Sequence, residues 1–194
     1  YFSKPLIMIW IAVCYLLCRS DRDPGFPVLL AFFFSWLGDL FLLLPDRNGI
    51  MFYLGVGGFF LAQLSYIFIF IRFSKKGSRG LLARKPLLFL PFLLYGVGIY
   101  LLLLPAMEGI MKPIIALYAL SLVGMSLAAL NRRGRVGRKS FRLVFSGSLL
   151  FVFSDTMLAI NTFVYDLPLS GLWIMSSYMA AQYLIMRGLL LGKA

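Results

Sequence analysis

The chain has 194 residues, of which 61% are hydrophobic and 13% charged, and its 19 Lys and Arg residues against 7 Asp and Glu give a formal net charge of +12. Soluble globular proteins are about 45–50% apolar and about 25% charged, so this apolar surplus excludes a single soluble core and indicates a surface that faces lipid. The sequence contains no histidine, which excludes His-based zinc sites, Ser–His triads and histidine proton shuttles.

Apolar runs of membrane-spanning length follow one another along the chain. A transmembrane helix needs about 20 mostly apolar residues. We predict seven spans, at Pro5–Cys18, Phe26–Leu44, Ile50–Phe73, Pro86–Leu104, Ile110–Leu130, Phe141–Val164 and Gly171–Leu191. Segments with Pro, Gly, Asn and Asp separate them, as expected for turns. The predicted fold is therefore all-α, a polytopic transmembrane helix bundle that forms one domain over residues 1–194.

Basic residues gather in alternate loops. The loops after the first, third and fifth spans and the C-terminal tail hold Arg19, Arg22, Arg72, Lys75, Lys76, Arg79, Arg84, Lys85, Arg132, Arg133, Arg135, Arg138, Lys139, Arg142, Arg187 and Lys193. The other loops hold only Arg47, Lys112 or no base. Because loops rich in Lys and Arg stay in the cytoplasm, the C-terminus is expected inside and Tyr1 outside. One additional helix before Tyr1 would place the true N-terminus inside and give eight spans.

The same charges indicate which partners to expect. Basic loops beside apolar spans are explained by topology and by contacts with anionic lipid headgroups, so membrane lipids are expected as partners and nucleic acid is not. We expect an integral protein of a bacterial inner membrane, and the sequence does not indicate its oligomeric state.

Two carboxylates stand inside predicted spans. Asp39 lies in the second span and Asp155 in the sixth, whereas the other acids, Asp21, Asp23, Asp46, Glu108 and Asp166, lie in loops. Intramembrane carboxylates are costly and usually functional. Both spans run in the same direction and place their Asp about 20 Å from the helix start, so the two can converge. Two close carboxylates at low dielectric do not both ionise, and we expect one to keep a proton and the other to act as a base. The alternative is two separate buried Asp residues, each capping a broken helix or bonding a neighbouring Ser.

Polar residues at helical spacing accompany the two carboxylates. The candidates for binding substrate are Ser35, Gln63, Tyr66, Ser154, Tyr178 and Gln182. Each could point inward and bond a carboxylate or a substrate, and the alternative for each is a polar contact that holds helices together. Carboxylates without His or paired thiolates form a poor transition-metal site, so neither a tightly bound metal nor a cofactor is expected, and a weakly held divalent ion is the alternative.

Several short motifs follow one another in a fixed order. They are Ser3-Lys4-Pro5-Leu6, Ser35-x-x-Gly38-Asp39, Phe59/Phe60, Ala62, Gln63, Tyr66, Pro113 to Tyr118, Met125, Phe151-x-x-Ser154-Asp155-x-x-x-Ala159 and Tyr178-x-x-Ala181-Gln182-Tyr183-Leu184. Together they resemble the YhhN family of lysoplasmalogenase-like membrane proteins over nearly the whole chain. The resemblance implies eight helices, of which the first is absent here. It also implies a hydrolase that cleaves the vinyl ether bond of a lysoplasmalogen, a lysophospholipid, to a fatty aldehyde and a glycerophospho-ethanolamine or -choline.

Within this resemblance, Asp39 and Asp155 are the expected catalytic pair, and the lipid chain would lie between helices with its headgroup at the outer interface. The position of Gln63 is often His in the family, and Gln cannot transfer protons. If that His is catalytic in other members, activity here is in doubt; if it only forms hydrogen bonds, Gln could substitute. The rival class is a small-solute or lipid transporter or channel with the Asp pair as a proton or cation site. A third class is a receptor or lipid-binding scaffold.

Overall fold

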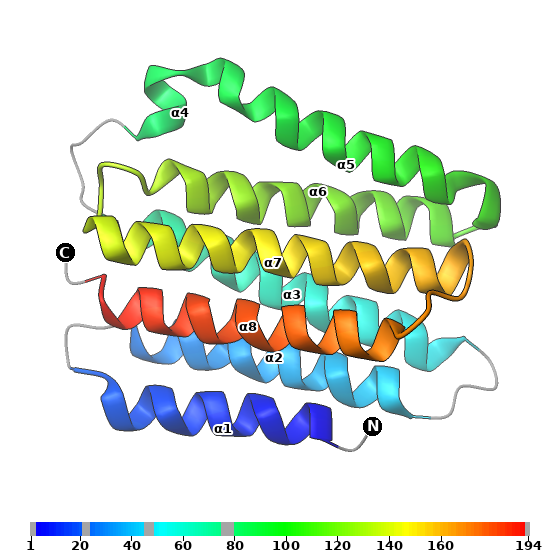
Figure 1. Cartoon of the computed structure of the whole chain (residues 1–194), viewed down its shortest axis with the longest axis horizontal. Coiled ribbons are helices and arrows are strands. Elements are labelled where there is room, and N and C mark those ends of the chain that lie inside the picture. The colour runs from blue at the N-terminus through cyan, green and yellow to red at the C-terminus, as the bar shows by residue number, and fades with distance from the viewer. Residues whose placement is uncertain (1–2, 21–23, 45–48, 75–79, 193–194) are drawn as a thin grey trace.

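The structure, a computed structural model, describes residues 3–20, 24–44, 49–74 and 80–192, and the side chains from residue 6 onward within them. Over these ranges the regular structure is helical. The helices are α1 (Ser3–Cys18), α2 (Gly25–Leu43), α3 (Ile50–Arg72), the short α4 (Leu81–Arg84), α5 (Leu90–Leu103), α6 (Met111–Asn131), α7 (Arg138–Phe163) and α8 (Ser170–Leu190), with 3-10 turns η1 (Pro86–Phe89) and η2 (Leu104–Ala106) flanking α5. Figure 1 shows the long helices side by side as a bundle, which confirms the predicted all-α polytopic fold.

Each predicted span corresponds to a long helix, with boundaries that differ by a few residues. Within the described ranges, five helical segments have the length and composition to cross a membrane, namely Gly25–Leu43, Ile50–Arg72, Pro86–Ala106, Met111–Asn131 and Arg138–Phe163, and Leu6–Cys18 is a shorter apolar helix. The α8 helix is not among these five segments, and it carries polar residues such as Ser177 and Gln182, both buried. It nevertheless lies along α7 within the bundle (Figure 1).

The charged loops lie at the two ends of the bundle. One end, called the basic end below, holds the connections after α1, α3 and α6 and the end of α8, and the opposite end holds the remaining connections (Figure 1). The predicted loop residues Asp21, Arg22, Asp23, Asp46, Arg47, Lys75, Lys76, Arg79 and Lys193 lie outside the described residues.

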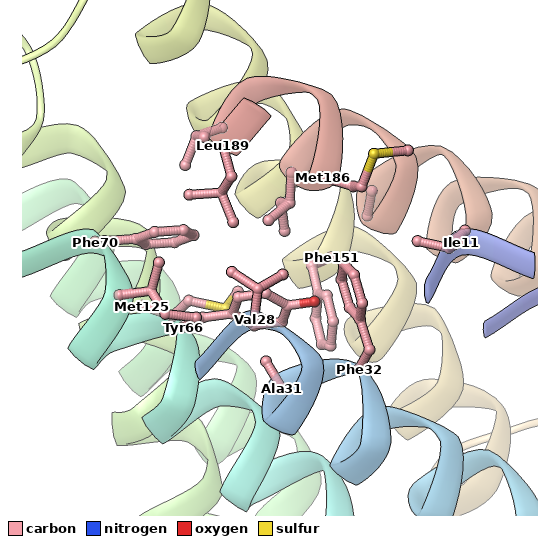
Figure 2. Close-up of a cluster of buried hydrophobic side chains, with 14 of the residues drawn as sticks. Ile11, Val28, Ala31, Phe32, Tyr66, Phe70, Met125, Phe151, Met186 and Leu189 are labelled. Carbon is pink, nitrogen blue, oxygen red and sulfur yellow. The ribbon is translucent and has the colours of Figure 1, made fainter. Parts of the chain in front are cut away.

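Helices α2 and α3 pack closely, as do α7 and α8, because glycines line both contacts. A Cβ atom on Gly58 would lie 2.8 Å from the backbone nitrogen of Gly38, and one on Gly147 would lie 2.9 Å from the carbonyl oxygen of Ala181. Side chains from α2, α3, α6, α7 and α8 then fill one core, and Figure 2 shows several of them converging, among them Phe32, Tyr66 and Phe151. Close backbone approach of this kind is typical of membrane helices.

The α5 helix lies at the edge of the bundle. Only 6% of the segment Pro86–Ala106 is buried, against 44% of the α3 segment. Its neighbours are α6 and, less extensively, α7. One side of the bundle between α6 and α7 is therefore covered by a single, largely lipid-facing helix.

Candidate functional site

Asp155 is held by two neighbouring helices. It is 9% exposed on α7. Tyr118 of α6 donates its hydroxyl hydrogen to Oδ2 of Asp155, and Nε2 of Gln63 on α3 donates to the same oxygen at 3.3 Å. Ser121, one turn after Tyr118, donates to Oε1 of Gln63 and so orients the amide with its NH₂ group toward the carboxyl. The carboxyl of Asp155 is therefore fixed by a phenol and an amide.

Asp39 is held by a different set of helices. It is 3% exposed on α2, and the hydroxyl of Tyr178 on α8 donates to its Oδ2 at 2.9 Å. One turn earlier on α2, the hydroxyl of Ser35 accepts a hydrogen bond from Nε2 of Gln182 at 3.1 Å. Tyr66 of α3 donates to Oε1 of the same Gln182. Polar contacts thus join α2, α3 and α8 beside this carboxyl.

Aromatic rings pack against one another beside both carboxyl groups. Phe59 packs edge-on against Tyr178 and Phe151, with ring centroids 5.9 and 6.4 Å apart. Phe151 lies one turn before Asp155 on the same helix, and Tyr178 carries the hydrogen bond to Asp39. Phe151 also packs against Tyr178, with ring centroids 5.8 Å apart, so these contacts link the side chain that bonds Asp39 to the turn of α7 before Asp155. In such an apolar setting each charge acts over a longer range than in water.

The two carboxyl groups differ in what they face. Asp155 lines a cavity of about 80 Å³ between α3, α5, α6 and α7, together with Phe59, Tyr118 and Thr156. A cavity of this size can hold several water molecules. Asp39 is not among the described residues that line it. Asp155 is thus the carboxyl that a molecule in the cavity can reach.

The structure places the predicted site residues in two groups. It brings Gln63 to Asp155, and Tyr178 to Asp39, and it joins the remaining predicted residues on α2, α3 and α8 to one another. Ser154 lies apart, because its hydroxyl donates to the backbone oxygen of Ile174 on α8 at 3.0 Å. Ser154 therefore holds α7 to α8 and joins neither carboxyl.

Sequence reasoning did not single out Tyr118 and Ser121 as site residues. They stand three residues apart on α6, the same spacing that identified Gln63 and Tyr66, so the signal was available. Thr156, next to Asp155, was also missed. Within the described residues there is no group of three or more His, Cys, Asp or Glu side chains that could hold a metal ion.

Apolar helices around a buried polar network define this chain as a polytopic integral membrane protein. Residues 1–189 match the YhhN family, and the chain belongs to that family, as its motifs predicted. It is similar to lysoplasmalogenase TMEM86B of Mus musculus, with 35% identity over 152 residues, which are 78% of this chain and 58% of the relative. The matching TMEM86B of Sus scrofa is 34% identical over 177 residues, 90% of this chain and 69% of the relative.

A second group of relatives carries the name TMEM86A. Lysoplasmalogenase TMEM86A of Homo sapiens is 29% identical over 190 residues, 93% of this chain and 73% of the relative. The chain spans 58% and 56% of the length of the mouse and rat TMEM86B proteins. No solved structure matches the chain at a significant level.

Proposed function

We propose that this protein is a membrane-embedded ether hydrolase that cleaves the vinyl ether bond of a lysoplasmalogen. The observation that carries the proposal is Asp155, a buried carboxyl that faces a cavity, while a second buried carboxyl, Asp39, is bonded by Tyr178, whose ring packs against Phe151 on the helix of Asp155. The names of the relatives support the same activity. The substrate would be a single-chain glycerophospholipid with an ethanolamine or choline headgroup.

Vinyl ether hydrolysis begins with protonation of carbon. A general acid gives its proton to the outer alkene carbon. The π electrons of the double bond form the new C–H bond, and the inner carbon, which is bound to oxygen, becomes an oxocarbenium ion. Water then adds to that carbon and loses a proton, which yields a hemiacetal. The hemiacetal breaks its bond to the glycerol oxygen, which takes up a proton, and the products are a fatty aldehyde and a free glycerol hydroxyl. The overall reaction consumes one water and needs an acid that is restored at the end.

The hydrogen bonds of Asp155 fit the role of this acid. Both of its donors, Tyr118 and Gln63, bond to Oδ2, as they would to the carbonyl oxygen of a protonated carboxyl. Oδ1 would carry the proton to the substrate and later take one from the attacking water. Burial among apolar side chains would favour the protonated form of a carboxyl such as Asp155, and Asp39, held by Tyr178, would supply a negative charge that stabilises the cation.

The resemblance described above sets Gln63 against a position that is often His in other members. The amide of Gln63 donates to Asp155 and accepts from Ser121, so both ends of the side chain form hydrogen bonds. This arrangement favours a hydrogen-bonding role over a catalytic one for Gln63. An amide can orient the carboxyl without transferring protons.

We further propose that the basic end lies in the cytoplasm, since basic loops are retained there. The C-terminus would then be cytoplasmic, in a bacterial inner membrane. A C-terminal fusion to green fluorescent protein would be fluorescent in that orientation and dark in the reverse one.

Aldehyde release from a 1-alkenyl lysophospholipid by the purified protein tests the function. We expect Asp155→Asn to lower the rate at least about a hundredfold, the usual contribution of a general acid, and Asp39→Asn to lower it as well. Asp166→Asn is the matched control, because Asp166 is exposed in the connection between α7 and α8. Full activity in Asp155→Asn would overturn the mechanism. Proton or cation uptake into proteoliposomes without aldehyde release would identify the rival transporter class.

A further inference from the structure

A larger cavity adjoins the one at Asp155. It has a volume of about 310 Å³ and lies between α5, α6 and α7, and we call it the α5–α7 groove. Its wall is mostly apolar and includes Phe92, Gly96, Val123, Leu149 and Val152. Ligand-binding pockets usually measure about 300–1,000 Å³, so the groove has the size of a binding site for one hydrocarbon chain.

The two cavities are adjacent and share part of their walls. Ile99, Ala119, Leu122 and Thr156 line both of them. Thr156 directly follows Asp155 on α7, so the junction lies beside the carboxyl proposed as the acid. A molecule that occupies the groove therefore has one end next to Asp155.

The groove and the Asp155 cavity extend in opposite directions from this junction. Along α7 the groove reaches back to Leu149, toward the basic end, and the cavity reaches forward to Phe163, at the opposite end. At 1.5 Å per residue the whole path from Leu149 to Phe163 is about 21 Å long, and Asp155 lies about 12 Å from the Phe163 end. A lipid with its headgroup at the opposite end would direct its chain toward the centre of the bilayer.

The polar groups along the groove are already partnered. The hydroxyls of Tyr95 on α5 and Thr156 on α7 lie 2.8 Å apart and share a hydrogen bond across the groove. The hydroxyl of Ser126, farther along, donates to the backbone oxygen of Leu122 at 3.2 Å. The groove therefore offers an occupant little hydrogen bonding, which suits a hydrocarbon chain better than a headgroup.

We propose that the α5–α7 groove binds the hydrocarbon chain of a single-chain lipid and places the first carbons of that chain beside Asp155. This inference rests on the proposed ether hydrolase. Since bilayer chains are as apolar as the groove, the groove adds little hydrophobic free energy and selects its occupant by shape and length. The residues at its far end, Phe92, Ser126 and Leu149, set the longest chain that fits.

Photocrosslinking tests chain binding independently of hydrolysis. The probe is a saturated 1-O-alkyl lysophospholipid, which has no vinyl ether, with a diazirine at the end of an octyl chain, added to the purified protein in nanodiscs. We expect labelling at Phe92, Ser126 or Leu149 that excess unlabelled alkyl lysophospholipid suppresses and diacyl phospholipid does not. Uniform labelling of lipid-facing residues such as Leu94 and Leu101, which excess alkyl lysophospholipid does not suppress, would overturn the inference. Labelling that the unlabelled lipid suppresses, in a protein that releases no aldehyde, would overturn the proposed hydrolase activity and would still support chain binding in the groove.

Chain-length selectivity gives a second test with a matched control. Leu149 is 41% exposed, so Leu149→Trp can shorten the groove without disturbing the core. We expect it to raise the rate for hexenyl over octenyl substrate about tenfold, a shift that steric mismatch of a few methylenes supplies. Leu117→Trp changes an exposed leucine of α6 outside both cavities and should leave the ratio unchanged. An equal loss at all chain lengths in Leu149→Trp would count against the groove as the chain site.

A glycine pair on α5 provides a blocking variant. Gly96 lines the groove, and a Cβ there would lie 2.6 Å from a methyl group of Val123, whereas a Cβ on Gly98 would meet nothing within 4 Å. Gly96→Leu is expected to abolish competed crosslinking at the far end, and Gly98→Leu to retain it. Retained far-end labelling in Gly96→Leu would overturn the assignment.

Discussion

Tyr118 on α6 donates its hydroxyl hydrogen to Oδ2 of Asp155 on α7, and both residues line the same cavity. The phenol thus orients the carboxyl from the neighbouring helix. Helices α6 and α7 are sequential and antiparallel, so a small rotation of either would break this contact. The relationship explains why the acidic group has a defined direction inside an otherwise apolar bundle.

Removal of this hydroxyl is expected to slow the reaction. Tyr118→Phe leaves the ring in place and removes one of the two described donors to Asp155. We expect kcat for aldehyde release to fall by about 10–100-fold, below the full contribution of a general acid, with KM nearly unchanged. Tyr183→Phe is the control, since Tyr183 is 51% exposed. A change in KM alone would show that Tyr118 binds substrate and does not position the acid.

Gln63 should be replaceable by another hydrogen-bonding side chain. Gln63→His can still donate to Asp155, whereas Gln63→Leu leaves a buried carboxyl with one donor fewer. An unmet buried hydrogen bond costs about 1–3 kcal/mol, so we expect Gln63→Leu to lower both activity and thermal stability in detergent. Gln63→His should retain at least half of each. If Gln63→Leu matches the parent protein in both measurements, the amide does not orient the carboxyl.

The contact of α7 with α8 should depend on the absence of a side chain at Gly147. A Cβ there would lie 2.9 Å from a backbone oxygen of α8, which cannot move aside as a flexible side chain could. Gly147→Val is expected to destabilise the protein by about 1–3 kcal/mol through overpacking. Gly98→Val, on the lipid-facing side of α5, should shift the unfolding midpoint little. Equal midpoints for the two variants would show that α7 and α8 can separate without cost.

Arg132 lies at the basic end, and its buried positive charge is expected to lower the free energy of unfolding at pH values below 10. Its guanidinium is 1% exposed and lies 5.6 Å from the ring centroid of Phe70, and its Nε and Nη1 have no hydrogen-bond partner among the described residues. Burial, and secondarily the charge of Arg135, lowers the pKa of Arg132 to about 10. Arg132→Met keeps the packing and removes the unpartnered donors, so we expect a gain of about 1 kcal/mol near neutral pH.

The sign of the pH dependence follows from the lowered pKa of Arg132. Above pH 10 the unfolded chain still binds the proton that the folded protein loses, so the stability of the parent protein rises with pH relative to Arg132→Met. Chemical denaturation should therefore show that Arg132→Met exceeds the parent protein in free energy of unfolding by less at pH 11 than at pH 8. Arg133→Met, at an exposed neighbour, is the control and should show no such trend. An advantage that grows with pH would contradict this account of Arg132.

The sequence by itself determined the helices and the unusual carboxylates. Lipid tolerates only long apolar segments with internally bonded backbones, so hydropathy alone located the long helices. The same physics marked Asp39 and Asp155, because charged groups are rare at membrane depth. Helical spacing also identified Gln63, Tyr178 and their neighbours as inward-facing polar residues, and the structure places these side chains in buried contacts.

Only the tertiary structure decided which polar group meets which carboxyl. A helix that is apolar on every face carries little sequence signal for the face that it turns inward, so the pairing of Tyr118 with Asp155 could not be predicted. The same ambiguity made Ser154 look like a site residue, although its neighbour Asp155 faces the cavity and Ser154 bonds to α8. The α5–α7 groove likewise exists only because three helices meet at particular rotations, which side-chain packing across the bundle decides.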